Sequence, residues 1–289
     1  MPVLTAENLT FLYSAGTPLE TAAVRDITFS AENGEIVGVI GHTGSGKSTL
    51  IQHFNGLLKP SEGKMFVLDK DIWAKENKKQ IRSVRFAVGL CFQYPEYQIF
   101  EDTVFNEIAY GPVQMGLDKN EVARRVYESM EFLGLKRELE KKSPFDLSGG
   151  QKRRVAIASI IAMKPKVLIL DEPCAGLDPK GRNRILNLIK DYQHVEGNTV
   201  IFVSHSMEDI AKIADRVLVL NKGRVAMCGT VSEVYSKGAE LKEMGLSVPE
   251  VTEVFLCLHD MGVPCSTGIY TVEQAVEEFR RLEKLREVR

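Results

Sequence analysis

A glycine-rich segment between an apolar run at residues 36–40 and a helix-forming run at residues 50–54 constrains this chain more than any other feature. Its pattern is G-x-x-x-x-G-K-[ST], in which inward-turned backbone N–H groups and the N-terminus of the next helix together hold an anion. We expect Lys47 to reach the β and γ phosphates of a nucleotide and the Ser48 hydroxyl to ligate Mg²⁺. The strand-to-helix context argues against a glycine-rich turn that binds nothing. The predicted phosphate loop consists of Gly41, His42, Thr43, Gly44, Ser45, Gly46, Lys47, Ser48 and Thr49.

Composition excludes several classes of protein. The 289 residues are 44% hydrophobic and 26% charged, as in an ordinary folded protein. Lys and Arg number 37 against 39 Asp and Glu, so no global positive field recruits nucleic acid, although a local basic patch stays open. The chain has no run of about 18 apolar residues and no signal-peptide pattern, which predicts a soluble protein that is still able to dock on a membrane protein. The five scattered cysteines are expected to be small buried hydrophobes in a reducing compartment.

The hydrophobic pattern predicts strands before a helical region. Alternation in residues 3–13 and 23–30 indicates two half-buried strands that form a small antiparallel layer. Two more strands are expected near residues 64–68 and 86–92, and residues 93–163 then show helical spacing. Tyr13, at a strand end, is placed to stack on an adenine ring, although an aromatic residue there is more often part of the core.

Two later segments have the pattern of strands buried on both faces. Residues 167–170 are apolar and lead into Asp171 and Glu172, and residues 198–203 lead into Ser204 and His205. Because ligands bind at the carboxyl ends of parallel strands, these polar side chains are expected to converge on the phosphate loop. Asp171 is then placed to hold Mg²⁺ and Glu172 to polarise water, with His205 at the γ phosphate. The alternatives are a solvated turn and a structural histidine.

A second glycine-rich element, LSGGQ, lies at residues 147–151 before a predicted helix at 152–162. Ser148 is a good helix N-cap and the glycines expose N–H groups, which predicts a second anion site. With this motif the chain resembles the nucleotide-binding subunits of ATP-binding cassette (ABC) transporters from Val3 to about Gly229. That resemblance implies an α/β P-loop NTPase fold: an N-terminal antiparallel β layer, a RecA-like parallel sheet core, a helical subdomain and a small helical C-terminal extension.

The resemblance also implies how ATP and Mg²⁺ are bound. Two cassettes pair head to tail, and each ATP lies between the phosphate loop of one and the LSGGQ residues of the other: Ser148, Gly149, Gly150 and Gln151. Asp171 is then a metal residue, Glu172 the general base and His205 the γ-phosphate switch. Tyr13 stacks on adenine. In the same way, Gln93 senses Mg²⁺ and the membrane partner, and Asp178 makes a cross-dimer contact.

A narrower resemblance, to the second ATPase type of energy-coupling factor transporters, rests on residues 92–100, 143–146 and 16–20 and on the helical C-terminus. It implies an ATP hydrolase that drives uptake of a vitamin or of nickel or cobalt ions. Its partners would be a second ABC ATPase, identical or different, an integral membrane coupling subunit and a small membrane substrate-binding subunit. It would work as a peripheral protein at the cytoplasmic face of the cell membrane.

Residues 1–229 are thus expected to form the nucleotide-binding domain, with a helical subdomain at about 94–163, and residues 230–289 a helical extension. Helices are predicted at 231–235, 251–261 and 271–286, the last one capped near Thr271. The extension is interpreted as an interaction domain rather than a solvated tail, because four apolar residues need a partner surface: Val251, Phe255, Leu256 and Leu258.

Three alternatives to this function stay open. A conventional ABC importer differs only in its partners. A soluble ABC protein of DNA repair or translation usually has two cassettes, a coiled coil or basic tracts. A phosphate-loop kinase or switch would not be expected to combine LSGGQ with His205.

Overall fold

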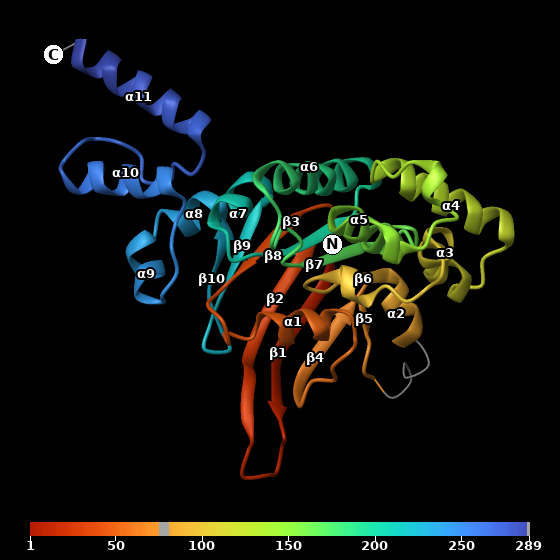
Figure 1. Ribbon diagram of the computed structural model, residues 1–289. Coiled ribbons are helices and arrows are strands. Elements are labelled where there is room, and N and C mark those ends of the chain that lie inside the picture. Colours follow the sequence, from red (N-terminus) through yellow and green to blue (C-terminus); the bar gives the residue numbers. More distant parts are fainter. Residues whose placement is uncertain (75–80, 288–289) are drawn as a thin grey trace.

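The computed structural model describes residues 1–74 and 81–287, and within these it contains two sheets (Figure 1). The first is antiparallel, in the order β2-β1-β4-β5, with strands β1 (Pro2–Tyr13), β2 (Thr21–Glu32), β4 (Glu62–Val67) and β5 (Lys70–Asp71). The second has the order β10-β9-β3-β8-β7-β6 and is parallel except at its edge, where β10 runs antiparallel to β9. Its strands are β3 (Ile36–Ile40), β6 (Val88–Cys91), β7 (Val167–Asp171), β8 (Thr199–Val203), β9 (Arg216–Asn221) and β10 (Arg224–Thr230). The expected antiparallel layer and parallel core are confirmed.

The parallel sheet forms the centre of the core. Strands β3, β7 and β8 are nearly unbroken apolar runs and are buried along their whole lengths, since both faces of the sheet are covered. Helix α1 (Lys47–Phe54) lies between the two sheets, and its Leu50 and Phe54 join the core that they share. The other face is covered by α5 (Gly149–Ile161), α6 (Pro179–Glu196) and α7 (Met207–Ile213).

Residues 81–161 depart from the predicted pattern at one point. The strand expected near 86–92 begins only at Val88, because α2 (Ile81–Ala87) runs directly into it. The helical spacing of residues 93–163 corresponds to α3 (Val104–Gln114), α4 (Lys119–Phe132) and α5, preceded by a short 3₁₀ helix at Pro95–Gln98. The apolar residues that recur at four-residue steps in α4 are buried: Val122, Val126 and Met130.

The C-terminal helices are α8 (Val231–Tyr235), α9 (Gly238–Glu243), α10 (Glu250–Asp260) and α11 (Val272–Glu287). Helix α9 was not expected from the sequence. Helices α10 and α11 stand apart from the rest of the chain in Figure 1 and share a small core around Phe255, Cys265 and Ile269. The predicted cap is confirmed, because the Gln274 N–H donates to the Thr271 hydroxyl at 3.2 Å.

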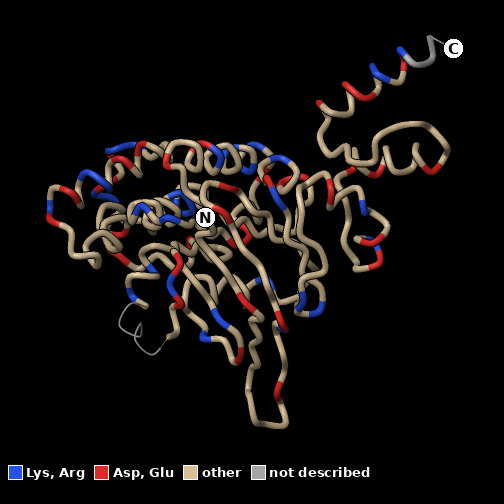
Figure 2. The backbone as a smooth tube through the Cα atoms, turned by 180° about the vertical axis from the view of Figure 1, so that it is seen from behind, with Lys and Arg blue, Asp and Glu red and all other residues tan. Residues whose placement is uncertain are grey.

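The cysteine prediction is correct at three positions and wrong at two. Cys91, Cys174 and Cys265 are buried, whereas Cys228 and Cys257 are exposed. Cys228 lies on the edge strand β10, where alternate side chains face solvent, and Cys257 lies on the outer side of α10. Acidic and basic residues are interspersed along the helices (Figure 2), in keeping with the small net charge. In the described ranges, no helix is both long and apolar enough to cross a membrane.

Candidate functional site

The phosphate loop connects the buried strand β3 to α1, as the sequence predicts. The Lys47 side chain turns back over the loop, and its Nζ donates to the carbonyl oxygens of Gly41 at 2.5 Å and His42 at 3.1 Å. Gly46 has φ 102°, and a Cβ there would lie 2.6 Å from the Ala23 carbonyl oxygen, so only glycine fits. At Gly44, φ is 81° and a Cβ would meet no atom within 4 Å, so the loop borders open space.

This loop has the chemistry of an anion site. The first N–H groups of α1 have no partner within the helix and point toward the loop. Burial lowers the pKa of Lys47 from its ordinary value, although the charges of Glu172 and Asp171 oppose the shift. Among the described residues, the ammonium group donates to two backbone carbonyls, and phosphate oxygens are stronger acceptors for it than these. The residues present therefore fit a bound polyphosphate.

Asp171, the last residue of β7, faces the start of α1. The Ser48 hydroxyl donates to Asp171 Oδ2 at 3.3 Å. Burial raises the pKa of Asp171, while the Ser48 hydrogen bond and the Lys47 charge oppose the rise. Hydroxyl and carboxylate oxygens suit Mg²⁺, which binds through one or two carboxylates plus phosphates and water. The described residues hold no cluster of three or more His, Cys, Asp or Glu side chains that could bind a metal ion by themselves. Mg²⁺ does not need such a cluster, because phosphates and water supply its other ligands.

Glu172 follows Asp171 in a left-handed conformation, with φ 51°. This backbone turn ends the strand, and the side chain lies 3.5 Å from His205 Nε2, measured at Glu172 Oε1. Burial, reinforced by the charge of Asp171, raises the pKa of Glu172 to about 7. Burial also lowers the pKa of His205, helped by the positive charge of Lys47, which favours the neutral imidazole. With a pKa of about 7, the Glu172 carboxyl group can exchange a proton near neutral pH.

Tyr13 ends β1 beside the start of α1, and 43% of its surface is exposed. Its hydroxyl lies 3.3 Å from the Thr49 hydroxyl, and the Phe11 ring packs edge-on against it with centroids 4.9 Å apart. The Phe11 ring also packs against the buried His53 ring, with ring centroids 5.0 Å apart. The tyrosine is therefore half core and half surface, with an exposed ring next to the phosphate loop.

The remaining predicted residues lie elsewhere. Gln93 is exposed, two residues past the end of β6. Asp178 caps α6, accepting the Gly181 N–H at 2.7 Å. Ser148 caps α5 in a capping box with Gln151, and both glycines between them are exposed. Across the two described ranges, no hydrogen bond joins the LSGGQ segment to the phosphate loop of the same chain.

The sequence did not reveal an ion pair between a buried arginine and a partly buried glutamate. Arg153 in α5 has a side chain that is 5% exposed, and it pairs with Glu96 of the 3₁₀ helix at 2.6 Å. One signal for Arg153 was present, since it lies four residues before the buried Ile157 and therefore on the apolar face of its helix.

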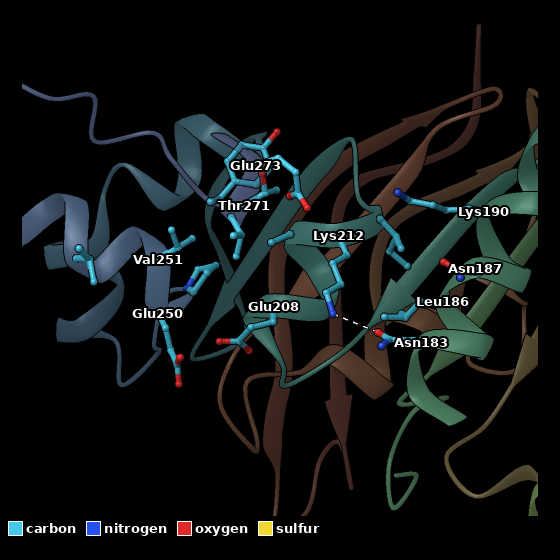
Figure 3. Close-up of a pocket in the computed structure, with 16 residues that line it drawn as sticks. Asn183, Leu186, Asn187, Lys190, Glu208, Lys212, Glu250, Val251, Thr271 and Glu273 are labelled. Carbon is cyan, nitrogen blue, oxygen red and sulfur yellow. Dashed lines mark hydrogen bonds between the residues drawn. The ribbon is translucent and has the colours of Figure 1, made fainter. Parts of the chain in front are cut away.

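A large cavity lies away from this site, between α6, α7 and the C-terminal helices (Figure 3). Its volume is about 710 Å³, and no phosphate-loop residue lines it. Lys212 crosses one wall and donates to Asn183 at 3.2 Å, while Thr271 and Glu273 lie on the opposite side. The candidate site is thus defined by its chemistry and not by the size of a cavity.

Comparison with known proteins agrees with this geometry. The ABC transporter family profile matches residues 24–175. An energy-coupling factor transporter ATP-binding protein, EcfA2, from Caldanaerobacter subterraneus subsp. tengcongensis is 54% identical over 281 residues, which is 97% of each chain. The chain belongs to the ABC transporter family, in its energy-coupling factor branch. As a member of that family, this ATPase binds and hydrolyses ATP.

Two solved structures have the same fold as this ATPase. CbiO1 from Clostridium perfringens, part of the ABC transporter complex CbiONQ, is 37% identical with a TM-score of 0.73, and the match covers 84% of this chain and 94% of CbiO1. The ATP-binding cassette MJ0796, solved as a dimer in a post-hydrolysis state bound to ADP and Pi, is 26% identical with a TM-score of 0.70. That match covers 78% of this chain and 98% of MJ0796.

Proposed function

We propose that this chain is the ATP-hydrolysing motor subunit of an energy-coupling factor transporter, driving uptake of a vitamin or transition-metal ion across the cytoplasmic membrane. It works as a peripheral subunit on the cytoplasmic face. The observation that carries the proposal is the meeting of Ser48 with Asp171 and of Glu172 with His205 at one sheet edge beside Lys47. These residues are suited to ATP hydrolysis, because phosphoryl transfer is catalysed mainly by positioning of the reactants and stabilisation of charge.

Each residue at the sheet edge has a distinct role in hydrolysis. Lys47 exchanges its two carbonyl partners for β- and γ-phosphate oxygens. Glu172 accepts a proton from the attacking water, and His205 holds Glu172 and contacts the γ phosphate. Ser48, Asp171 and Gln93 are the residues that would hold Mg²⁺, which neutralises charge on the phosphates when bound.

Residues 148–150 of the LSGGQ segment are exposed, which favours pairing with a second cassette. Ser148, Gly149, Gly150 and Gln151 lie at the surface at the start of α5. The Ser148 and Gln151 N–H groups are bonded within the capping box, so the Gly149 and Gly150 N–H groups are the ones that would face an ATP bound by another chain. Asp178 lies at the start of α6 and makes the cross-dimer contact. The dimeric arrangement of the cassette MJ0796 supports this pairing. Tyr13 supplies the adenine-stacking surface on the phosphate-loop side.

The C-terminal extension, residues 230–289, strengthens that pairing. On α11, Val272, Val276 and Phe279 are spaced by four and three residues, and 68%, 43% and 45% of their surfaces are exposed. Such an apolar stripe on one helix face is typical of a protein interface. The boundary with the nucleotide-binding domain, residues 1–229, falls at the end of β10.

A groove in the helical subdomain, residues 94–163, is suited to the membrane coupling subunit. Its volume is about 330 Å³, and it lies between α2, the 3₁₀ helix at Pro95–Gln98, α3 and α5. Phe100 and Tyr110 line it as an edge-to-face pair with centroids 5.0 Å apart, and both are about half exposed. An exposed aromatic groove of this kind accepts a partner helix.

Purification of the tagged chain from its native membranes in mild detergent tests the proposal. Mass spectrometry should identify a second ABC ATPase, a polytopic coupling subunit and a small membrane protein, and the small protein reveals the substrate. Recovery with a periplasmic-binding-protein system would instead indicate a conventional importer. Recovery alone, or with soluble nucleic-acid proteins, would leave the ATPase intact and refute the transport assignment.

A further inference from the structure

Arg153 connects three segments: its own helix α5, the 3₁₀ helix at Pro95–Gln98, and the turn at residues 173–175 that follows the catalytic strand β7. It lies in α5, two residues past the LSGGQ segment, and its side chain is 5% exposed. Its guanidinium group donates four hydrogen bonds, all to residues outside its own helix. A buried arginine of this kind holds its partners in a fixed geometry, because the planar fork allows few arrangements.

On one side, Arg153 binds Glu96. Arg153 Nε donates to Glu96 Oε2 at 3.0 Å and Nη2 donates to Oε1 at 2.6 Å, a paired fork-to-fork contact. Glu96 belongs to the 3₁₀ helix whose Pro95 and Gln98 line the proposed coupling groove. A shift of that groove wall therefore acts directly on the guanidinium group.

On the other side, Arg153 holds the turn that follows the catalytic carboxylate. Its Nη1 donates to the Pro173 carbonyl at 3.3 Å and to the Ala175 carbonyl at 2.6 Å. Pro173 is bonded to Glu172, and the Ala175 N–H donates back to the Glu172 carbonyl at 3.1 Å. Since Glu172 has the unfavourable φ of 51°, its side-chain direction depends on how this turn is held.

We propose that Arg153 is a positioning residue that couples the groove wall, through Glu96, to the orientation of Glu172. The inference rests on the proposed function, because the groove matters only if a coupling subunit occupies it. A helix seated in the groove fixes Pro95–Gln98, the ion pair passes this position to the Pro173–Ala175 turn, and Glu172 is held toward the attacking water. Arg153 touches no substrate.

The test compares ATP turnover of the purified transporter complex with wild-type chain, Arg153→Lys and Glu96→Gln. Lysine keeps the charge but cannot bind the carboxylate and two carbonyls in one plane. Both variants should lower kcat about tenfold to a hundredfold, as misplacement of a catalytic group does, while KM for ATP stays within about twofold. The double variant should lose no more than Arg153→Lys alone, because the two residues act as one unit.

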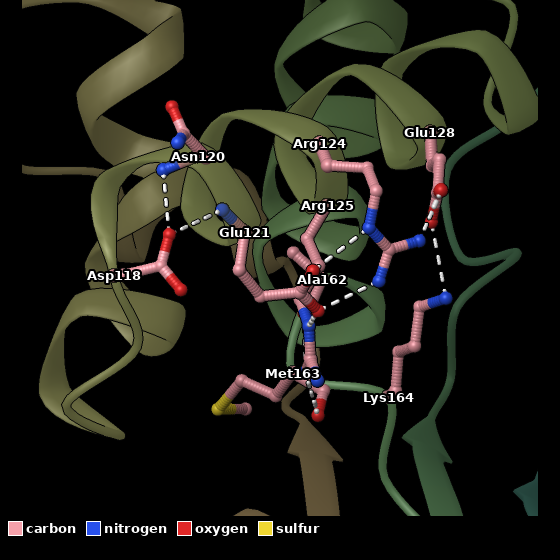
Figure 4. A network of polar contacts seen from close by, with 9 residues as sticks. All are labelled: Asp118, Asn120, Glu121, Arg124, Arg125, Glu128, Ala162, Met163 and Lys164. Atoms are coloured by element: carbon pink, nitrogen blue, oxygen red, sulfur yellow. Dashed lines mark hydrogen bonds and ion pairs between the residues drawn. The ribbon is translucent and has the colours of Figure 1, made fainter.

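Arg125 provides a matched control (Figure 4). It lies in α4 and also combines an ion pair with a bond to a backbone carbonyl: its Nε donates to Glu121 Oε1 of the same helix at 2.7 Å, and its Nη1 donates to the Met163 carbonyl, just past the end of α5, at 3.1 Å. Neither partner belongs to the turn at residues 172–175 that Arg153 holds. Arg125→Lys should therefore leave kcat unchanged, even if both arginine variants lower the melting temperature equally.

The outcomes separate the inference from the proposed function. If wild-type chain forms the complex but Arg153→Lys and Glu96→Gln keep full kcat, or lose it only in step with a raised KM, Arg153 has no positioning role. An equal kcat loss in Arg125→Lys would also overturn the inference, since any weakened subdomain would then suffice. If wild-type chain forms no complex with a coupling subunit, the proposed function fails and the inference fails with it.

Discussion

The hydroxyl of Ser48 lies 3.3 Å from the Asp171 carboxylate, although 123 positions separate the two residues in the chain. The contact exists because β3 and β7 both pair with β8 in parallel, so the loop after β3 and the end of β7 meet at one edge. This pair is the proposed core of the Mg²⁺ site.

Ser48→Ala removes one of these oxygen ligands. We expect the Mg²⁺ concentration that half-activates ATP hydrolysis to rise about tenfold, which is the effect of one lost contact to a charged partner. A Mg²⁺ titration of ATP turnover measures this. Ser48→Thr keeps the hydroxyl and should behave as wild type, and equal behaviour of both variants would contradict the ligand role.

Glu172→Gln should still bind ATP and form the cassette dimer but turn over very slowly. Glutamine has the shape of glutamate but cannot accept a proton from water, so kcat should fall by about 10²- to 10⁴-fold. Phosphate release and gel filtration with ATP check the two halves of this prediction. Near-normal phosphate release would refute the general-base assignment.

Lys47→Ala should lose nucleotide affinity. The buried ammonium group donates to the loop carbonyls of Gly41 and His42, and its loss removes charge-assisted contacts to phosphate. We expect the Kd for ATP to rise about tenfold to a hundredfold. Equilibrium binding of a fluorescent ATP analogue measures it, with Lys212→Ala, far from the loop, as the control. Unchanged affinity in Lys47→Ala would exclude the phosphate role.

His53 should make the chain less stable in acid. The residue is fully buried, its Nδ1 lies 2.7 Å from the Thr49 carbonyl, and Nε2 has no partner among the described residues. Burial lowers the pKa of His53 below the ordinary 6.5, although the Thr49 hydrogen bond opposes this. Well above pH 6.5 the imidazole is neutral in both folded and unfolded chains, so it adds no pH dependence there.

Below pH 6.5 His53 is protonated in the unfolded chain but stays neutral in the folded chain, because burial lowers its pKa. The free energy of unfolding should therefore fall by up to about 1.4 kcal/mol per pH unit until the folded-state pKa is reached. Urea unfolding of wild type and His53→Gln at pH 7 and at about pH 5.5 isolates this term, because all other titrating groups are shared. Identical pH slopes for the two proteins would refute it.

Phe279→Ser should weaken the cassette pair. The ring lies on the exposed stripe of α11, and a buried aromatic anchor at an interface contributes about 2 kcal/mol or more, which is roughly thirtyfold in Kd. Analytical ultracentrifugation with ATP measures dimerisation. Glu277→Ser, exposed on the same helix, is the control, and no change in either variant would show that α11 is not in the interface.

The sequence by itself determined the local elements of this protein and their chemistry. The phosphate loop, the buried strands that end at Asp171 and Val203, and the capped start of α5 are all signalled by neighbouring residues, because helix caps, glycine turns and apolar runs act over a few positions. Knowing that parallel strands end at one edge was enough to predict that Asp171, Glu172 and His205 meet near Lys47.

The tertiary structure alone decided which distant residues touch. Pairing of Arg153 with Glu96, 57 positions earlier, depends on how α5 packs against the 3₁₀ helix, and no local pattern encodes that packing. The exposure of Cys228 follows from its place on an edge strand, and the left-handed turn at Glu172 follows from the contacts that hold it. Such features are set by the summed packing of many elements, because each single contact contributes little compared with the cost of ordering the chain.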